Sequence, residues 1–180
     1  MCGRAAAPTF ATMSRPRSIP DDAIFAEVRR LLAEGGDKAV AFASVARATG
    51  LAAPTLVQRY GSREAMVRAA LTAAWDALDA QTAAAEAAAE GALGLLKALG
   101  AGPATADPSR LAADFRDPAL RARAEAWRAR VEAALVRALG SGPKAREAAA
   151  ILFMAWQGRM LWQGVGGKAI RLKDLVRRLG

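Results

Sequence analysis

The stretch SVARATGLAAPTLVQRYGS at residues 44–62 decides the fold of this chain. It predicts a short helix over 44–49, a turn at Gly50, and a second short helix that starts near Ala53 or Pro54 and ends at Tyr60. Gly50 is the residue that adopts a left-handed turn at least cost, and a proline in the first turn of a helix loses little. Helices this short need packing partners. The pattern therefore predicts a helix-turn-helix unit whose second helix faces outward.

Helical patterns extend from this unit in both directions, and alternating β-branched runs are missing. Upstream, a helix is expected over 21–34, capped by Asp21 and ended by Gly35 and Gly36. Downstream, Ser62 caps a helix that runs to or past Gln81. The further expected elements are a helix or junction over 83–92, a helix over 93–99, a linker over 100–108, a helix from 118 to 139 capped by Asp117, a helix over 144–163, and a last helix that carries Ile170, Leu172, Leu175, Val176 and Leu179. The fold class is all-α.

The residues around the central stretch resemble those of the tetracycline-repressor (TetR) family of transcriptional regulators. The matching residues are Ile24–Gly35, Val45-Ala46, Thr49-Gly50-Leu51, Pro54-Thr55-Leu56, Tyr60-Gly61 and Ser62-Arg63-Glu64-Ala65-Met66. The resemblance covers about residues 20–75. It implies a flexible basic arm over 1–19, a helix-turn-helix DNA-binding domain over 20–66, and a helical effector-binding and dimerisation domain over 67–180. It also implies a ligand-responsive repressor that binds a palindromic operator as a homodimer.

The polar side chains of the central stretch are the candidates for contact with duplex DNA. Gln58 can pair with adenine and Arg59 with guanine, each with about 1–3 kcal/mol of discrimination, while Thr55 lies near the same side. Other polar and basic groups would hold phosphates, and an N-terminal arm would enter the minor groove. The full set is Ser44, Arg47, Pro54, Thr55, Gln58, Arg59, Tyr60, Arg63, Arg15 and Arg17. Val57 departs from the family, which commonly has an aromatic residue there, and Ala43, Ala52 and Ala53 add no polar group.

The helix over 144–163 is apolar on almost all sides, so two different surfaces must pack against it. One cover is the subunit's own core, and the other is expected to be a partner subunit, although a central helix of a monomer is an alternative. The expected dimer residues are Leu152, Ala155, Arg159, Trp162, Leu172, Leu175 and Val176. The expected effector pocket, for an apolar or aromatic molecule, comprises Trp75, Leu78, Phe115, Trp127, Phe153, Trp156, Gln157 and Met160. Each pocket residue could equally be core.

The composition of the chain favours some classes of function and excludes others. The 180 residues include 26 Lys and Arg against 17 Asp and Glu, a net charge of +9, which favours a polyanionic partner such as DNA. No histidine is present, so a Ser-His-Asp triad is excluded, and the single cysteine, Cys2, excludes a disulfide framework. The carboxylates that could form acid–base pairs are better explained as helix caps. We expect no enzyme activity, cofactor or metal.

No segment has the pattern of a signal peptide, and charged or amide side chains interrupt the most apolar stretch, 148–165. A soluble, cytoplasmic protein that does not enter the membrane is expected. One alternative remains open, a small-molecule or lipid-binding protein on the same helical scaffold that does not bind DNA.

Overall fold

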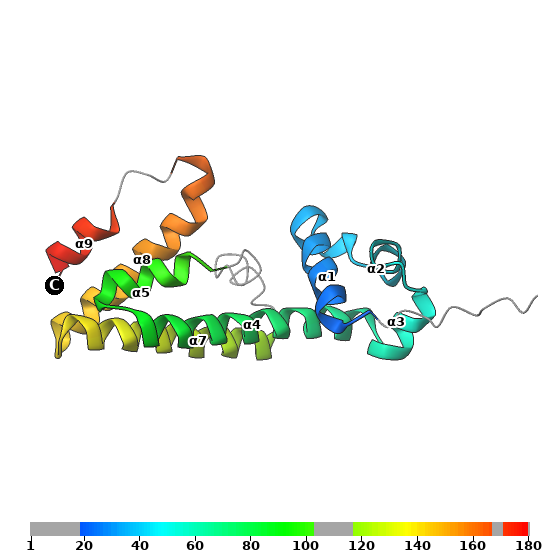
Figure 1. Cartoon of the computed structure of the whole chain (residues 1–180), viewed down its shortest axis with the longest axis horizontal. Helices are drawn as coiled ribbons and strands as arrows, with labels where there is room; N and C mark the ends of the chain where they lie inside the picture. The colour runs from blue at the N-terminus through cyan, green and yellow to red at the C-terminus, as the bar shows by residue number, and fades with distance from the viewer. Residues whose placement is uncertain (1–18, 103–116, 167–170, 180) are drawn as a thin grey trace, which may run out of the picture.

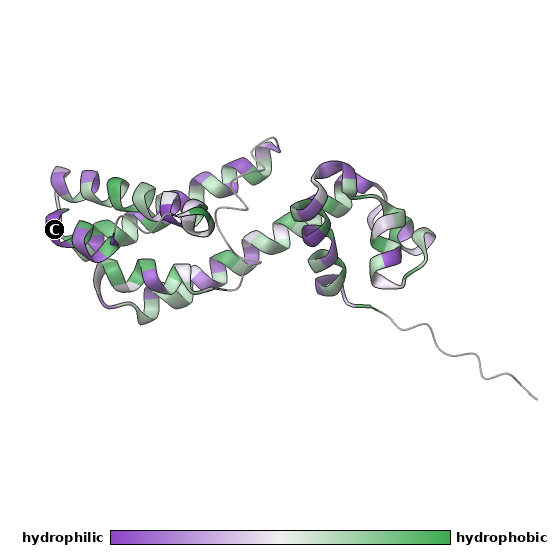
Figure 2. Cartoon of the chain, turned by 90° about the horizontal axis from the view of Figure 1, so that it is seen from above, coloured by the Kyte–Doolittle hydropathy of each residue, from purple (hydrophilic) through white to green (hydrophobic). Residues whose placement is uncertain are grey.

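The computed structural model describes residues 19–102, 117–166 and 171–179. These residues form an all-α fold with two groups of helices (Figure 1). The first group contains α1, α2 and α3, and the second contains α5, α7, α8 and α9. One long helix, α4, crosses from the first group into the second, as the view from above also shows (Figure 2). No strand occurs in these three described ranges.

The N-terminal group consists of α1 (Asp21–Gly35), a 3-10 turn η1 (Asp37–Ala39), α2 (Phe42–Thr49) and α3 (Ala53–Tyr60). The short helices occur where the sequence predicts them, although α2 begins two residues earlier. The expectation that Asp21 caps α1 is wrong, because Asp21 is the first residue of the helix and Pro20 is in the N-cap position. A proline fits there because its backbone is already extended and it has no N–H to satisfy.

Helix α4 (Arg63–Ala88) begins where Ser62 accepts a hydrogen bond from the backbone N–H of Ala65 at 3.0 Å, as predicted. It ends before a two-residue junction, and α5 (Gly91–Gly100) follows. The predicted apolar stripe of α4 is buried throughout. Its members are Met66, Val67, Ala70, Leu71, Ala74, Trp75 and Leu78. The first part of this stripe packs against α1, where the guanidinium of Arg29 donates to the carbonyl of Ala70 at 3.1 Å. Because α4 is continuous across residue 66, the expected division of the chain there stays a prediction.

The C-terminal group is built on α7 (Pro118–Leu139) and α8 (Pro143–Trp162), which form an antiparallel pair, followed by η3 (Gln163–Val165) and α9 (Leu172–Leu179). Asp117 caps α7 as predicted, accepting from the backbone N–H groups of Ala119 and Leu120. Gly140, with φ of 120°, ends that helix where the sequence predicts a break. Ile170, expected on the last helix, lies outside the described residues.

A row of ion pairs joins α7 to α4 along the length of the two helices. Arg123 contacts Asp76 at 2.6 Å and Asp79 at 2.7 Å, and Arg130 contacts Glu86 at 2.6 Å. At the start of α7, the guanidinium of Arg68 and the helix N–H groups together lower the pKa of Asp117. The contacts of Arg123 and Arg130 lie along the second half of α4, so a displacement of α7 would act on the helix that carries the N-terminal group.

Candidate nucleic-acid interface

The turn between α2 and α3 has the geometry that the sequence predicts. Gly50 has φ of 73° and ψ of 11°, the left-handed conformation, and it connects two helices that pack on each other. Val45 and Ala46 of α2 and Leu56 of α3 are buried between the helices. Leu56 is the one buried residue of α3, and the other residues of this helix are half-buried or exposed.

The outer face of α3 is exposed to solvent. Pro54, Thr55, Val57, Gln58 and Arg59 are all exposed on it. Thr55 and Gln58 lie one turn apart, so their side chains share one face. Val57, 44% exposed, contributes an apolar surface that can contact a thymine methyl group. The major groove of B-DNA admits an α-helix, and this face presents both polar and apolar side chains.

Arg59 and Tyr60, two of the predicted contacts, are both engaged with the start of α1. The guanidinium of Arg59 donates to the carbonyl of Ile19 at 2.9 Å and lies 3.4 Å from the carboxylate of Asp21. The Tyr60 hydroxyl donates to the same carboxylate, and its ring packs on Phe25 with 6.0 Å between centroids. Burial and the hydrogen bond to Asp21 raise the pKa of Tyr60. Arg59 must give up these bonds before it reaches a base.

Two of the residues expected to hold phosphates also have structural bonds. Arg63 donates to the carbonyl of Val40 at 2.6 Å and pairs with Asp37 at 2.7 Å, which raises the pKa of the guanidinium. Ser44 accepts from the backbone N–H of Ala41 at 2.9 Å and thereby holds the start of α2. Arg47 is exposed, and no hydrogen bond or ion pair joins it to another described residue. Arg15 and Arg17 lie outside the described residues.

Most residues of the predicted effector pocket are buried in the core of the C-terminal group, so the pocket stays a prediction. Trp127 has ring centroids at 6.1 Å from Trp75, 5.8 Å from Phe153 and 6.4 Å from Trp156, and all four residues are buried. Leu78 is fully buried beside them. Trp127 meets Trp75 and Phe153 edge to face, so these rings pack directly on one another. Two expected residues, Gln157 and Met160, are half-buried, and Phe115 lies outside the described residues.

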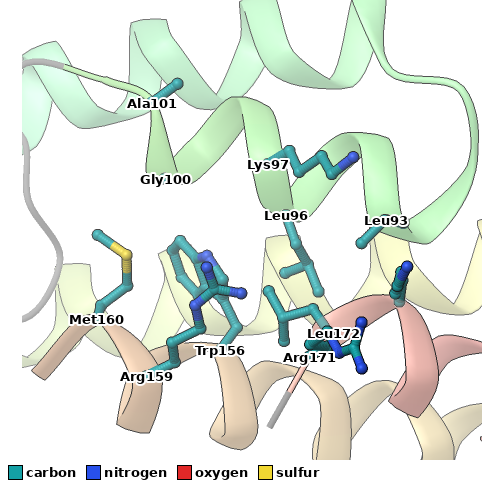
Figure 3. A pocket seen from close by; sticks show the side chains of 11 residues that line it. Leu93, Leu96, Lys97, Gly100, Ala101, Trp156, Arg159, Met160, Arg171 and Leu172 are labelled. Carbon is teal, nitrogen blue, oxygen red and sulfur yellow. The ribbon is translucent and has the colours of Figure 1, made fainter. Parts of the chain in front are cut away.

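A cavity lies instead on the other side of the core, between α5, α8 and α9 (Figure 3). Its volume is about 390 Å³. Trp156 and Met160 are the expected pocket residues that line it. The other lining residues were not predicted as part of a pocket, and they are Leu93, Leu96, Lys97, Gly100, Ala101, Arg159, Arg171, Leu172 and Lys173. Arg159 was expected at a dimer interface. No single segment contains a signal for this site, because three separated helices form it.

The residues expected at a dimer interface are divided between the subunit's own core and its surface. Leu152 is 0% exposed and Leu172 is buried, so both belong to the subunit's own core. Ala155, Leu175 and Val176 are half-buried, whereas Trp162 and Arg159 are exposed. A second apolar face of α8 does remain outside the core, as predicted for a helix that needs two covers. We call it the α8 outer face, and it consists of Ile151, Met154, Leu161 and Trp162, continued by Val165 of η3.

Across the described ranges, no three His, Cys, Asp or Glu side chains come together in a way that could hold a metal ion. None of the described helices combines the length and the apolar character that a bilayer crossing requires.

The chain thus has a three-helix group that contains a helix-turn-helix, joined through one long helix to a second group of helices. Solved structures share this fold with the chain. One is a candidate transcriptional regulator from Saccharomonospora viridis in complex with choline, with 16% identity and a TM-score of 0.65 over 88% of this chain and 92% of that one. A transcriptional regulator from Rhodococcus sp. Rha1 has 19% identity and a TM-score of 0.64 over 89% and 92%. A candidate TetR-family regulator from Rhodococcus sp. has 20% identity and a TM-score of 0.56 over 88% and 93%. No family model and no curated protein matches the sequence.

Proposed function

We propose that this protein is a DNA-binding transcriptional regulator of the TetR type, a repressor that acts in the cytoplasm. The observation that carries the proposal is the outer face of α3. Leu56 anchors this helix, and Thr55, Val57 and Gln58 are left exposed on a unit whose turn is held by Gly50. A helix presented in this way can enter a major groove. The three structural neighbours, whose descriptions all name a transcriptional regulator, support the same reading.

Each residue of the interface has a proposed role. Gln58 reads a base edge, with Thr55 and Pro54 beside it at the start of α3. Arg47 contacts a phosphate, since it is exposed on α2 without an ion pair to any described residue. Arg59 reads a guanine after it leaves Asp21, a step that reduces its net contribution. The sugar–phosphate backbone of the DNA is contacted by Ser44, Tyr60 and Arg63, through side-chain atoms that are not used in their hydrogen bonds within the protein. Arg15 and Arg17 belong to the N-terminal arm that enters the minor groove.

The operator is bound by a homodimer that pairs through the α8 outer face. Water contact with large apolar side chains such as Met154, 60% exposed, and Trp162, 59% exposed, is unfavourable, and a second copy would remove it. Gly158 lies midway along this face, and a Cβ there would meet no atom within 4 Å. Two copies of α8 can therefore cross closely at that position. Arg159, Ala155, Leu175 and Val176 would lie at the edge of the contact.

A Gly158→Lys variant tests the pairing. The subunit core tolerates it, because the new side chain points into open space. At a two-fold crossing the two lysines would meet, so analytical ultracentrifugation should find monomers with unchanged helix content. The matched control, Ala77→Lys, places the same charge on an exposed position of α4 and should stay dimeric. If both variants have the mass of the parent, the interface lies elsewhere.

Ligand binding in the C-terminal group is the proposed regulatory event. A ligand that binds one orientation of α4 better than another shifts the population and changes the spacing of the two recognition helices. The ion pairs of Arg123 and Arg130 with α4 support such coupling. The complex of one structural neighbour with choline supports a small-molecule ligand for this scaffold.

The decisive experiment is selection of bound duplexes from a random pool, followed by measurement of affinity against salt. The expected result is a sequence with two-fold symmetry whose binding falls steeply as salt rises. Retention of no duplex at low salt would contradict the proposal. That outcome would favour the alternative, a carrier of small molecules or lipids. The engagement of Arg59 with Asp21 is the observation that favours this alternative.

A further inference from the structure

The cavity between α5, α8 and α9 has an apolar floor. Leu96, Trp156 and Leu172, one from each helix, are buried at its base, and Leu93 and Met160 are half-buried beside them. At about 390 Å³ it is near the lower end of the range of about 300–1,000 Å³ that small-molecule sites occupy. Figure 3 shows these side chains facing a common space between the three helices. Such a floor accommodates a short alkyl chain or a single aromatic ring.

The charged residues described at the rim of the cavity are all cationic. They are Lys97, Arg159, Arg171 and Lys173, and no carboxylate is among the described lining residues. The nearest acid on α9 is Asp174, which lies 3.4 Å from the guanidinium of Arg171 and neutralises that side chain in part. The other three cations have no ion pair to a described residue. Positive charge converging from three helices raises the potential at the mouth of the cavity.

The cavity wall also offers a hydrogen-bond donor close to Gly100. A Cβ at Gly100 would lie 3.4 Å from the indole Nε1 of Trp156 and 3.6 Å from the sulfur of Met160. The indole N–H has no acceptor among the described residues, although Trp156 is 1% exposed. An indole nitrogen donates only. With the lysines and arginines, the polar groups of this site are donors.

We propose that this cavity binds a small amphipathic organic anion, a carboxylate with a short apolar tail or ring. The tail lies on Leu96, Leu172 and the ring of Trp156. The carboxylate takes charge-assisted hydrogen bonds from Arg159 and its neighbours. An organic cation such as a quaternary ammonium is disfavoured, because the described lining residues provide neither a carboxylate nor an aromatic ring without cations beside it.

One contact connects this cavity to α4. The side-chain amide of Gln81, on α4, donates to the carbonyl of Leu99 at 2.7 Å, and Leu99 directly precedes Gly100 in the cavity wall. A ligand that displaces the end of α5 would therefore act on α4 through Gln81. This step, that the anion changes DNA affinity, rests on the proposed function, whereas binding of the anion does not.

Three probes with the same tail separate the possible ligand classes by calorimetry on the full chain without DNA. They are octanoate, octanamide and octyltrimethylammonium. The expected result is that octanoate binds at least about tenfold more tightly than either of the others, and that added salt weakens its binding. The inference is overturned if the ammonium binds as well as the carboxylate, or if none of the three binds.

Three variants locate the binding. Arg159→Gln should weaken octanoate binding about tenfold, while its matched control, Arg146→Gln on an exposed position of the same helix, should leave it unchanged. Gly100→Leu should abolish binding without loss of charge, since its Cβ fits at ordinary contact distance and the rest of the side chain enters the cavity. Equal octanoate affinity in Arg159→Gln and Arg146→Gln, or undiminished affinity in Gly100→Leu, would place the anion elsewhere and refute the assignment.

A last experiment tests the cavity inference and the proposed function independently of each other. Octanoate is titrated into the complex with a selected duplex, and release of the DNA is measured for the parent and for Gln81→Met. The parent should release the duplex, and Gln81→Met should still bind octanoate but release the duplex less. Calorimetric binding of octanoate to a chain that binds no duplex would support the cavity inference and contradict the regulator function. Binding of a duplex by a chain that does not bind octanoate would support the regulator function and contradict the cavity inference.

Discussion

The buried pair formed by Thr82 and Trp127 gives a sharp test of whether the aromatic cluster is core. The indole N–H of Trp127 donates to the Thr82 hydroxyl at 2.8 Å, and that hydroxyl donates to the carbonyl of Leu78 at 2.7 Å. Thr82 is 0% exposed. In Thr82→Val the shape is kept but the indole N–H loses its acceptor, which costs about 1–3 kcal/mol. A chain of this length loses roughly 2–4 °C of melting temperature per kcal/mol, so the melting temperature should fall by about 2–12 °C.

Thermal unfolding followed by circular dichroism measures this effect, and the chain has its own control. Thr49 donates to the carbonyl of Val45 at 2.8 Å, in the same way that Thr82 bonds to Leu78, but no indole donates to it. Thr49→Val should therefore change stability by no more than about 0.5 kcal/mol. In a Trp127→Phe background, Thr82→Val should become nearly neutral, since the donor is gone. An equal loss of stability with and without the indole would refute the reasoning.

Three shorter predictions concern the N-terminal group. Gln58→Ala should weaken binding to a selected duplex by about 1–3 kcal/mol, measured by fluorescence anisotropy, while the melting temperature stays the same; unchanged affinity would remove Gln58 from the reading surface. Gly50→Ala should destabilise the fold by about 1 kcal/mol in chemical denaturation, because its φ of 73° is strained for alanine, whereas Gly94→Ala inside α5 should stabilise it; the reverse order would contradict the role of the turn. Tyr60 is the single tyrosine, so absorbance at alkaline pH reports it alone. Its pKa lies above the ordinary 10.0, so the folded chain should keep the phenol proton past that pH and lose stability as pH rises further, and Asp21→Asn should lower the pKa. An ordinary titration in a chain that is still folded would show that burial and Asp21 do not act on this group.

Much of the fold could be predicted because its signals are local. Ser62 and Asp117 cap helices with their own side chains, and Gly50 and Gly140 adopt conformations that favour glycine. The buried stripe of α4 follows from spacing alone, since one apolar face recurs along the helix. The exposed polar face of α3 follows from the same rule applied to a helix with one buried residue, Leu56.

The remaining features depend on neighbours that the sequence does not identify. Helix α8 is apolar on both sides, so spacing could not decide that Leu152 faces the core and Met154 faces solvent. The aromatic residues had the right composition for a ligand pocket, but Trp127 and its neighbours pack on one another. The cavity in their place depends on how α5, α8 and α9 meet. The bond between Arg59 and Asp21 joins residues 38 positions apart, and no local pattern contains it.

Some of the basic residues that the chain has in excess stabilise the fold, and others are available to contact DNA. On α7, Arg123 and Arg130 are engaged with carboxylates of α4, so these arginines hold the fold together and add little attraction for DNA. At the α2–α3 unit, Arg59 and Arg63 are engaged as well, which leaves Arg47 as the clearest unpaired cation among the described residues of that unit. Each phosphate neutralised contributes about 0.9 to the slope of affinity against salt. If the proposed function holds, one subunit therefore has a weak electrostatic hold on a duplex, and two recognition helices on one operator are needed for affinity. Pairing through the α8 outer face is then a requirement for DNA binding itself.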